Sequence, residues 1–183
     1  HRQRQMCIRH SDHRLHVLHL TSAVEADWLA ANKGDLITTE VCPQHLTFEQ
    51  TDVEGIGTRL QMNPPIRYAH DRDTLWNRLK DGTIDCIATD HAPHTLANKA
   101  LGFPTAHSGM PGVETSLPCM LTHAANGMCS IADVARWMCE GPARVYGMVG
   151  KGRLAAGYDA DLVLVDMENH RTIQDSDTWT RVG

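Results

Sequence analysis

Three segments of the chain alternate or concentrate apolar residues in the way that strands do. Residues 14–20 (Arg-Leu-His-Val-Leu-His-Leu) alternate polar and apolar side chains, whereas residues 36–42 and 83–89 are rich in β-branched residues. Both patterns are typical of strands, because successive side chains of a strand point to opposite faces. A fourth run, Leu-Val-Leu-Val at residues 162–165, follows the turn sequence of residues 157–161 and predicts a further, buried strand.

Segments with helical patterns lie between and after these strands. Ser22 is an N-cap candidate, and Glu25, three residues later, completes a capping-box pattern. We therefore predict a helix from Ala23 to Asn32, which Gly34 ends. Residues 44–66 contain a Pro-Pro pair and are expected to be irregular. Further helices are predicted at residues 71–80, 113–126, 131–138 and 142–146, with a loop of about twenty residues before Gly112.

The alternation of strands and helices places the chain in the α/β class, with a parallel sheet. A complete (β/α)8 barrel needs about 200–250 residues or more, and this chain has 183. We therefore expect the C-terminal portion of such a barrel, and a small doubly wound sheet is the alternative. The barrel is favoured because residues of metal-ligand type follow the predicted strands, where barrel enzymes place their chemistry.

Composition and charge argue against several classes of function. With 17 Lys and Arg against 22 Asp and Glu, the formal charge is −5 and no basic cluster stands out, so nucleic-acid binding is not expected. No apolar run reaches the roughly 18 residues that a membrane-spanning helix needs. The six cysteines form no C-x-x-C pair and no apolar signal segment begins the chain, so we expect reduced thiols and a cytoplasmic location. The chain also lacks an initiating Met, and we expect it to be part of a larger protein.

Asp90 is the first candidate for chemistry. It follows the predicted strand at residues 83–89, and His91 and His94 lie near it in a loop that contains Gly and Pro. A carboxylate at this place could bind a divalent ion, and it could take a proton from water bound to the ion, whose pKa can fall to about 7. As an alternative, Asp90 could simply cap the next turn of the backbone.

Two histidines, His16 and His19, lie three residues apart on the first predicted strand, so their side chains point to opposite faces. His19 is at the end of the strand, directly before the helix cap, where it could serve as a metal ligand. A core histidine whose ring is satisfied by backbone hydrogen bonds is the alternative for His19 and the preferred interpretation of His16.

The segments around Asn63 and Ser108 could bind a ligand. The amide of Asn63 offers a donor and an acceptor, which suits a ligand that carries both a ring N–H and a carbonyl group. A turn leading into Pro64 is the simpler alternative. Gly109, after Ser108, provides backbone that a ligand can approach closely, although an ordinary loop turn explains the same residues. Arg67 could bind a carboxylate, but a surface arginine is the preferred interpretation.

Together these segments resemble the dihydroorotases of the amidohydrolase superfamily. The most specific are Thr-Asp-His-Ala-Pro-His at residues 89–94 and Met-Asn-Pro-Pro at residues 62–65. Leu-His-Val-Leu-His-Leu-Thr-Ser (15–22), Glu-Val-Cys-Pro-Gln-His-Leu (40–46) and Gly-Met-Pro-Gly-Val-Glu-Thr (109–115) also resemble the family. The sister hydantoinases and allantoinases share the general pattern but usually differ at the first two segments.

The resemblance implies a distorted (β/α)8 barrel that holds two divalent ions, commonly zinc, which share a hydroxide. By position, His19 resembles a histidine ligand of one ion. Asp90 resembles the aspartate that binds the other ion and acts as general acid and base. The implied reaction is the reversible interconversion of dihydroorotate and N-carbamoyl-aspartate in pyrimidine biosynthesis.

The resemblance also implies residues that hold the substrate and a division of the chain. Asn63 and His94 resemble residues that bind dihydroorotate, with the backbone of Ser108 and Gly109 nearby. Residues 141–147 and 152–162 resemble the return of the family's chain to its small β domain. We therefore expect the barrel portion at residues 1–147 and part of the small β domain at residues 148–183.

Several parts of the family pattern have no match in this chain. The His-x-His motif, the bridging Lys or Asp and one further His ligand are missing, so we expect this chain alone to be inactive. Gln44 stands where many relatives carry His, and Cys42 resembles the hydantoinases. The alternatives are therefore a dihydropyrimidinase (hydantoinase) or allantoinase relative, and a non-catalytic dihydroorotase-like scaffold that partners aspartate transcarbamoylase. A homo-oligomer is compatible with any of these.

Overall fold

A three-stranded parallel sheet forms the centre of the fold. The computed structural model describes residues 13–174, 177, 179 and 180. The strands are β1 (Leu15–Val17), β2 (Ile37–Val41) and β3 (Cys86–Ile87), and they lie side by side in the order β1-β2-β3. Leu15 pairs with Ile37, and Glu40 pairs with Cys86. The predicted α/β class and parallel sheet are confirmed.

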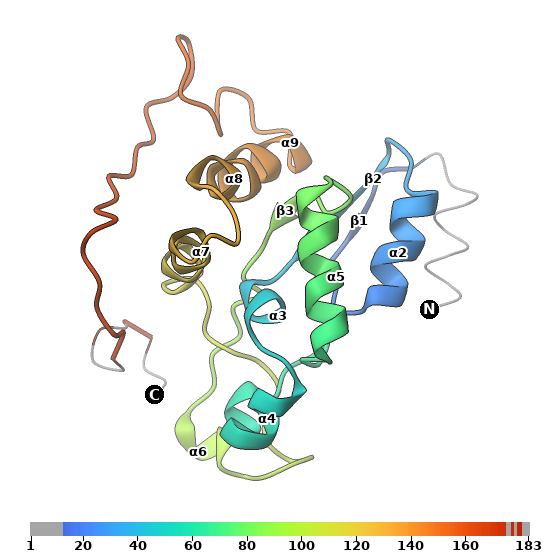
Figure 1. The fold of residues 1–183 in the computed structure, drawn as a ribbon, viewed down its shortest axis with the longest axis vertical. Helices are drawn as coiled ribbons and strands as arrows, with labels where there is room; N and C mark the ends of the chain where they lie inside the picture. The colour runs from blue at the N-terminus through green and yellow to red at the C-terminus, as the bar shows by residue number, and fades with distance from the viewer. Residues whose placement is uncertain (1–12, 175–176, 178, 181–183) are drawn as a thin grey trace.

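Two helices cover one face of this sheet (Figure 1). Helix α2 (Ala23–Asn32) follows β1 and has the predicted bounds, because the Ser22 hydroxyl accepts a hydrogen bond from the Glu25 N–H and caps its first turn. Helix α5 (Ala69–Lys80) precedes β3 and packs beside α2. Leu29, Leu75, Trp76 and Leu79 from these helices join Val17, Ile37, Val41 and Ile87 in the buried core.

The strands are shorter than predicted, and local causes explain two of the differences. Strand β1 ends at Val17, before the left-handed backbone of His19 (φ 35°) turns the chain out of the sheet. The N–H of Ile84 donates to the carbonyl of Arg78 in α5, so this part of the predicted third strand lies in the turn that follows the helix. The ladder between β2 and β3 is correspondingly short.

The prediction that residues 44–66 are irregular was wrong for most of that segment. It contains α3 (Pro43–Thr47), α4 (Gln50–Ile56) and the 3-10 helix η1 (Gly57–Leu60). Pro43 occupies the first position of α3, where a missing N–H costs nothing. Glu49 and Asp52 form a reciprocal capping box at the start of α4, which uses Glu and Asp in place of the usual Ser and Glu.

In the second half of the described chain the regular elements are helices, and residues 148–174 are irregular. The loop after β3 contains the short helix α6 (Leu96–Lys99). The helices predicted beyond Gly112 are present as α7 (Ser116–Ala125), α8 (Ile131–Ala135) and α9 (Gly141–Val145). A π-helical segment, η2 (Arg136–Glu140), joins α8 to α9. Both η2 and α9 contact β3, on the opposite flank from β1.

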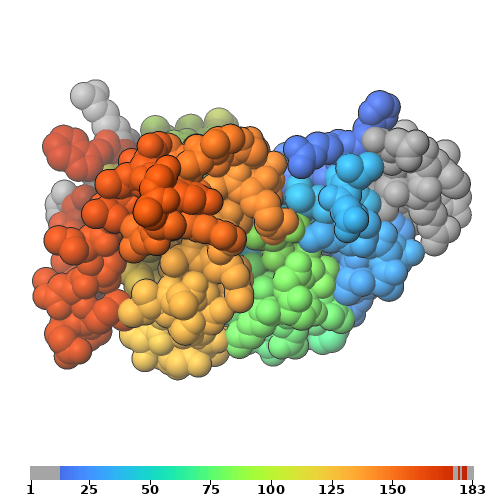
Figure 2. All heavy atoms as spheres, turned by 90° about the horizontal axis from the view of Figure 1, so that it is seen from above, coloured from blue at the N-terminus to red at the C-terminus, as the bar shows by residue number. Residues whose placement is uncertain are grey.

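The strand predicted at residues 162–165 is absent, and this expectation was wrong. Leu162 is 65% exposed, Val163 71% and Leu164 99%. No other strand of the described chain lies beside this segment, so its apolar side chains have nothing to pack against. Residues 148–174 lie at the end of the molecule away from β1 and α2 (Figures 1 and 2). The expected domain boundary at residue 147 stays a prediction.

Two further expectations concern cysteines and membranes. All five cysteines in the described residues are free thiols: Cys42, Cys86, Cys119, Cys129 and Cys139. Cys7 lies outside the described residues. Within the described part of the chain, no helix combines the length and apolar character that a bilayer crossing requires.

Candidate functional site

His19 and Asp90 follow two strands of the sheet at the same edge. His19 comes after β1 and Asp90 after β3, and the carboxyl ends of parallel strands meet at one edge of a sheet. Both residues have left-handed backbone, with φ of 35° for His19 and 47° for Asp90. Among the described residues, they are the only two other than glycine with positive φ. Such backbone costs about 1 kcal/mol or more for a residue with a side chain, and it gathers at functional sites.

His45 links these two residues and was missed by the sequence reasoning. It lies in α3, directly after β2, the strand between β1 and β3. Its pKa is lowered from 6.5 to about 4, first by burial, while hydrogen bonding to Pro64 and the charge of Asp90 oppose the shift and the charge of His19 adds to it. His19, His45 and Asp90 therefore share one neighbourhood. The sequence signal that could have identified His45 is its place directly after the middle strand, because His19 and Asp90 follow the two neighbouring strands.

The neutral ring of His45 leaves one nitrogen without a partner. Nε2 lies 3.0 Å from the carbonyl oxygen of Pro64, so it carries the hydrogen and donates it. Nδ1 is then an acceptor, and it is buried without a hydrogen-bond partner in the described structure. Buried polar atoms are normally satisfied. An orphaned lone pair beside His19 and Asp90 fits a place where a cation or a substrate N–H would complete the site.

The four residues expected to bind substrate fall into two groups. His94, Ser108 and Gly109 come together, because His94 Nε2 lies 3.0 Å from the carbonyl oxygen of Ser108. Gly109 approaches so closely that a Cβ there would lie 3.1 Å from His94 Nε2. Asn63 is exposed and lies two residues beyond Gln61, whose carbonyl accepts a hydrogen bond from the Gly109 N–H at 3.0 Å. The backbone therefore brings Asn63 to the same loop, although no contact joins its side chain to His94.

The segment after Asp90 is fixed against the segment that contains Gly109. The Ala92 N–H donates to the Met110 carbonyl at 3.0 Å, and His91 forms an isolated bridge with Met110. Nδ1 of His91 accepts hydrogen bonds from the N–H groups of Gly112 and Val113. His91 is thus used in holding the loop together rather than as a free ligand.

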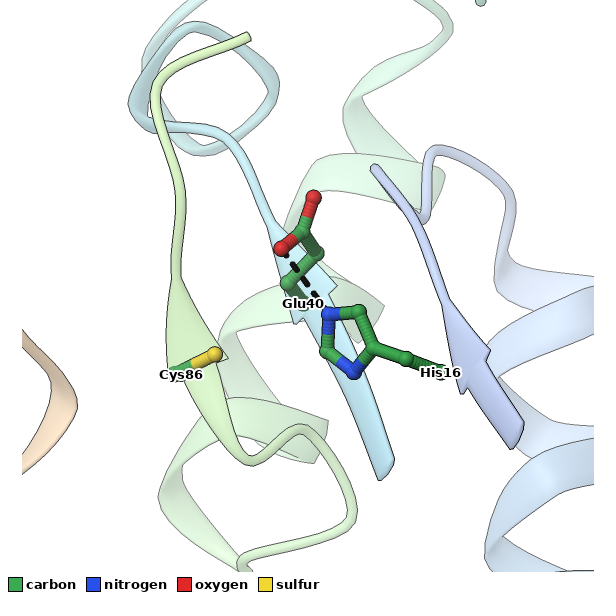
Figure 3. A group of neighbouring side chains, drawn as sticks. All are labelled: His16, Glu40 and Cys86. Carbon is green, nitrogen blue, oxygen red and sulfur yellow. Dashed lines mark hydrogen bonds and ion pairs between the residues drawn. The ribbon is translucent and has the colours of Figure 1, made fainter. Parts of the chain in front are cut away.

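A second cluster of metal-ligand atoms lies on the face of the sheet opposite α2 and α5. His16, Glu40 and Cys86 come from β1, β2 and β3, and each offers an atom within 4.8 Å of the others (Figure 3). His16 Nε2 donates to Glu40 at 2.9 Å, and the Thr38 hydroxyl lies 2.7 Å from Nδ1. Burial, and then the charges of Glu40 and Asp85, raise the pKa of the Cys86 thiol to about 12.

Hydrogen bonds hold the side chains of this cluster in place. Both ring nitrogens of His16 have partners, but these are the side chains of Thr38 and Glu40 and not the backbone groups that the preferred interpretation expected. Because burial raises the pKa of the Cys86 thiol, an ion bound here would have to displace the thiol proton. The cluster is therefore a candidate metal-binding group by spacing, and its hydrogen bonds satisfy it in the absence of metal.

Comparison with known proteins gives the family. Residues 12–180 match the amidohydrolase family. The chain is 44% identical over 163 residues to a dihydroorotase of Halobacterium salinarum, which covers 89% of this chain and 38% of that protein. It is 40% identical over 162 residues to an allantoinase of Streptomyces avermitilis, covering 87% of this chain and 36% of the relative. Among solved structures, an L-hydantoinase (dihydropyrimidinase) from Arthrobacter aurescens superimposes with a TM-score of 0.74 at 36% identity, covering 80% of this chain and 34% of that one.

The chain belongs to the amidohydrolase family. Its fold is the corresponding part of the family's barrel, as the likeness to the hydantoinase structure confirms. The chain spans less than half of the length of the curated relatives it matches. The resemblance to dihydroorotases is confirmed, and the sister families named as alternatives are also among the relatives.

Proposed function

We propose that the intact protein containing this chain is a dihydroorotase, which interconverts dihydroorotate and N-carbamoyl-aspartate in the cytoplasm. The single observation that carries the proposal is the arrangement of His19, His45 and Asp90 after three adjacent parallel strands. The dihydroorotase relatives at 40–44% identity support it. So does the resemblance of the segments at residues 62–65 and 89–94, at which the sister families usually differ.

Two divalent ions, which we propose to be zinc, fit the donors that the chain supplies. The amidohydrolase family is metal-dependent. Neighbouring strands lie about 4.8 Å apart, and β2 separates β1 from β3. His19 and Asp90 therefore start about two strand spacings apart, which suits one ligand for each of two adjacent ions. When bound, such ions polarise a carbonyl group and lower the pKa of water to about 7.

Asp90 is the proposed general acid and base. Hydrolysis of a cyclic amide needs a group that accepts a proton from the attacking water and delivers it to the departing ring nitrogen. A carboxylate at the mouth of the site can do both, since it is a base before the attack and an acid after it. In the reverse direction, the same carboxylate takes the proton from the nitrogen that closes the ring.

Asn63, His94 and the backbone at Ser108 and Gly109 are the proposed substrate contacts. Dihydroorotate presents ring N–H groups, ring carbonyl oxygens and a carboxylate. The Asn63 amide matches an N–H and a carbonyl together. Because the Ser108 carbonyl already holds His94, substrate binding here uses a prearranged ring rather than a mobile one.

The test is an assay of the full-length protein with Zn²⁺ on dihydroorotate, dihydrouracil and allantoin. We expect preference for dihydroorotate, and an Asp90→Ala variant should lose about 100- to 10,000-fold in turnover. Asp73→Asn, an exposed carboxylate of α5, serves as control and should leave turnover unchanged. Preference for allantoin or dihydrouracil would assign the protein to a sister family. No turnover of any substrate by the zinc-loaded wild type would favour the non-catalytic scaffold.

A further inference from the structure

Lys99 is a buried cation whose partners are all backbone carbonyls. It ends α6 and is 6% exposed. Its ammonium group donates to the carbonyl oxygens of Gln61 at 2.8 Å, His107 at 2.9 Å and Gly109 at 2.8 Å. An ammonium group has three N–H donors, so each donor has one acceptor. Among the described residues, no carboxylate lies within ion-pair distance of it, although a buried charge usually has one.

The three carbonyls belong to the two segments that the proposed function uses. Gln61 lies two residues before Asn63, and Gly109 is itself an expected substrate contact. The Gly109 N–H also donates to the Gln61 carbonyl at 3.0 Å. The Gln61 side-chain amide donates to the Ala106 carbonyl at 2.7 Å. Lys99 therefore lies at the centre of the contacts that join these two segments.

Lys99 is itself held from a third direction. The Thr58 hydroxyl in η1 donates to the Lys99 backbone carbonyl at 2.5 Å. The N–H of Lys99 donates to the Thr95 carbonyl, one turn earlier in the loop. A side chain anchored at its backbone and bonded three times at its tip has little freedom. Lys99 therefore holds the loop at residues 106–109 at a fixed distance from η1.

We propose that Lys99 is the positioning residue for substrate binding: its ammonium group fixes the backbone of residues 107–109 against Gln61, so that Asn63, His94 and Gly109 keep one spacing. This inference rests on the proposed function for its substrate. Because the three donors of the Lys99 ammonium group are used by backbone carbonyls, we expect its loss to weaken binding of substrate and transition state alike. Such a loss raises KM and leaves kcat nearly unchanged.

Lys99→Met in the full-length, zinc-loaded protein tests the inference, because Met keeps the stem and removes all three donors. Hydrogen bonds from a charged group contribute enough that we expect KM for dihydroorotate to rise about 10- to 100-fold, with a much smaller change in kcat. Lys80→Met, an exposed lysine of α5, is the matched control and should leave KM unchanged. An unchanged KM in Lys99→Met, or an equal loss in kcat, overturns the inference.

A second readout does not depend on the reaction. The Gly109 amide should exchange its hydrogen at least about tenfold faster in Lys99→Met, because its acceptor segment is released, whereas α5 amides should not change. Equal exchange rates at Gly109 in the two proteins overturn the inference, whether or not the wild type turns over dihydroorotate. Absence of turnover by the wild type alone contradicts only the proposed function. If Lys99→Met does not fold, Thr58→Val replaces it, and an unchanged KM there has the same meaning.

Discussion

Arg144 of α9 donates a hydrogen bond from Nη2 to Asp85 Oδ1 at 2.9 Å, across 59 residues of chain. The other oxygen of Asp85 accepts from Lys33 Nζ at 2.5 Å and from the Thr39 N–H at 2.8 Å. Asp85 is buried and lies directly before β3. One carboxylate thus connects the end of α2, the middle of β2, the start of β3 and α9.

Removal of this carboxylate should destabilise the fold strongly. Asp85→Ala removes the carboxylate partner of the half-buried Lys33, which keeps only the Thr83 carbonyl, and it removes the acceptor of the buried Thr39 N–H. We therefore expect a loss of about 3–5 kcal/mol in the free energy of unfolding. Urea unfolding followed by circular dichroism measures it. Asp27→Ala, which removes an exposed partner of Arg78, should cost less than about 1 kcal/mol. Equal losses would mean that Asp85 has no special part in the fold.

Gly109→Ala should disturb the loop beside the site for steric reasons. A Cβ at this position would lie 2.5 Å from the carbonyl oxygen of Ala92, and φ is +141°. The backbone must move, so we expect a loss of about 1–3 kcal/mol together with weaker substrate binding. Gly127→Ala is the control, because φ there is +76° and nothing lies within 4 Å. The loss in free energy of unfolding for Gly127→Ala should therefore reflect backbone strain alone, and its KM should be unchanged.

The left-handed backbone at His19 predicts an unusual order of stability among its variants. His19→Gly should be more stable than His19→Ala by about 1 kcal/mol, because glycine adopts positive φ without a Cβ clash. At an ordinary exposed position the order is the reverse, since glycine costs entropy. Thermal unfolding of the two variants gives the comparison. Greater stability of the alanine variant would show that the backbone relaxes when the imidazole is removed.

The buried His45 predicts a loss of stability in mild acid. Its folded pKa of about 4 lies below the ordinary value of 6.5, so the unfolded chain binds the proton first as the pH falls. The contribution is complete above about pH 6.5 and disappears as the pH falls to about 4, by about 3 kcal/mol at most. Unfolding free energies measured with EDTA in the buffer should fall less steeply for His45→Gln. The same slope in both proteins would contradict the shift.

Sequence patterns predicted an element correctly where neighbouring residues alone determine it, as a capping residue determines the start of a helix. The bounds of α2 follow from Ser22 and its neighbours, and the predicted helix matched them. The run at residues 162–165 has the same local character as a strand, yet a strand needs a partner, and the described chain provides none. The capping box of Glu49 and Asp52 departs from the usual residue types, so α4 was not predicted.

The sequence suggested members of the candidate site one at a time, and their arrangement came only from the fold. His19 and Asp90 were proposed because each follows a predicted strand, and Gly109 was proposed because it is a glycine in the long loop. His45 was missed because its meaning comes from lying between two other strand ends, which pairing of the strands decides. Lys99 was missed for a related reason, since nothing in the sequence near it indicates that three distant carbonyls surround its ammonium group.

Strand β1 pairs with β2 alone among the described residues, and in the family's barrel a preceding parallel strand would pair along its other side. A separately produced polypeptide that carries the preceding units of the family's barrel could add itself there by extending the same ladder. The seam between two such pieces would be recognised mainly through main-chain geometry, which tolerates much sequence change. Split versions of barrels of this family could therefore be reassembled from halves of different origin.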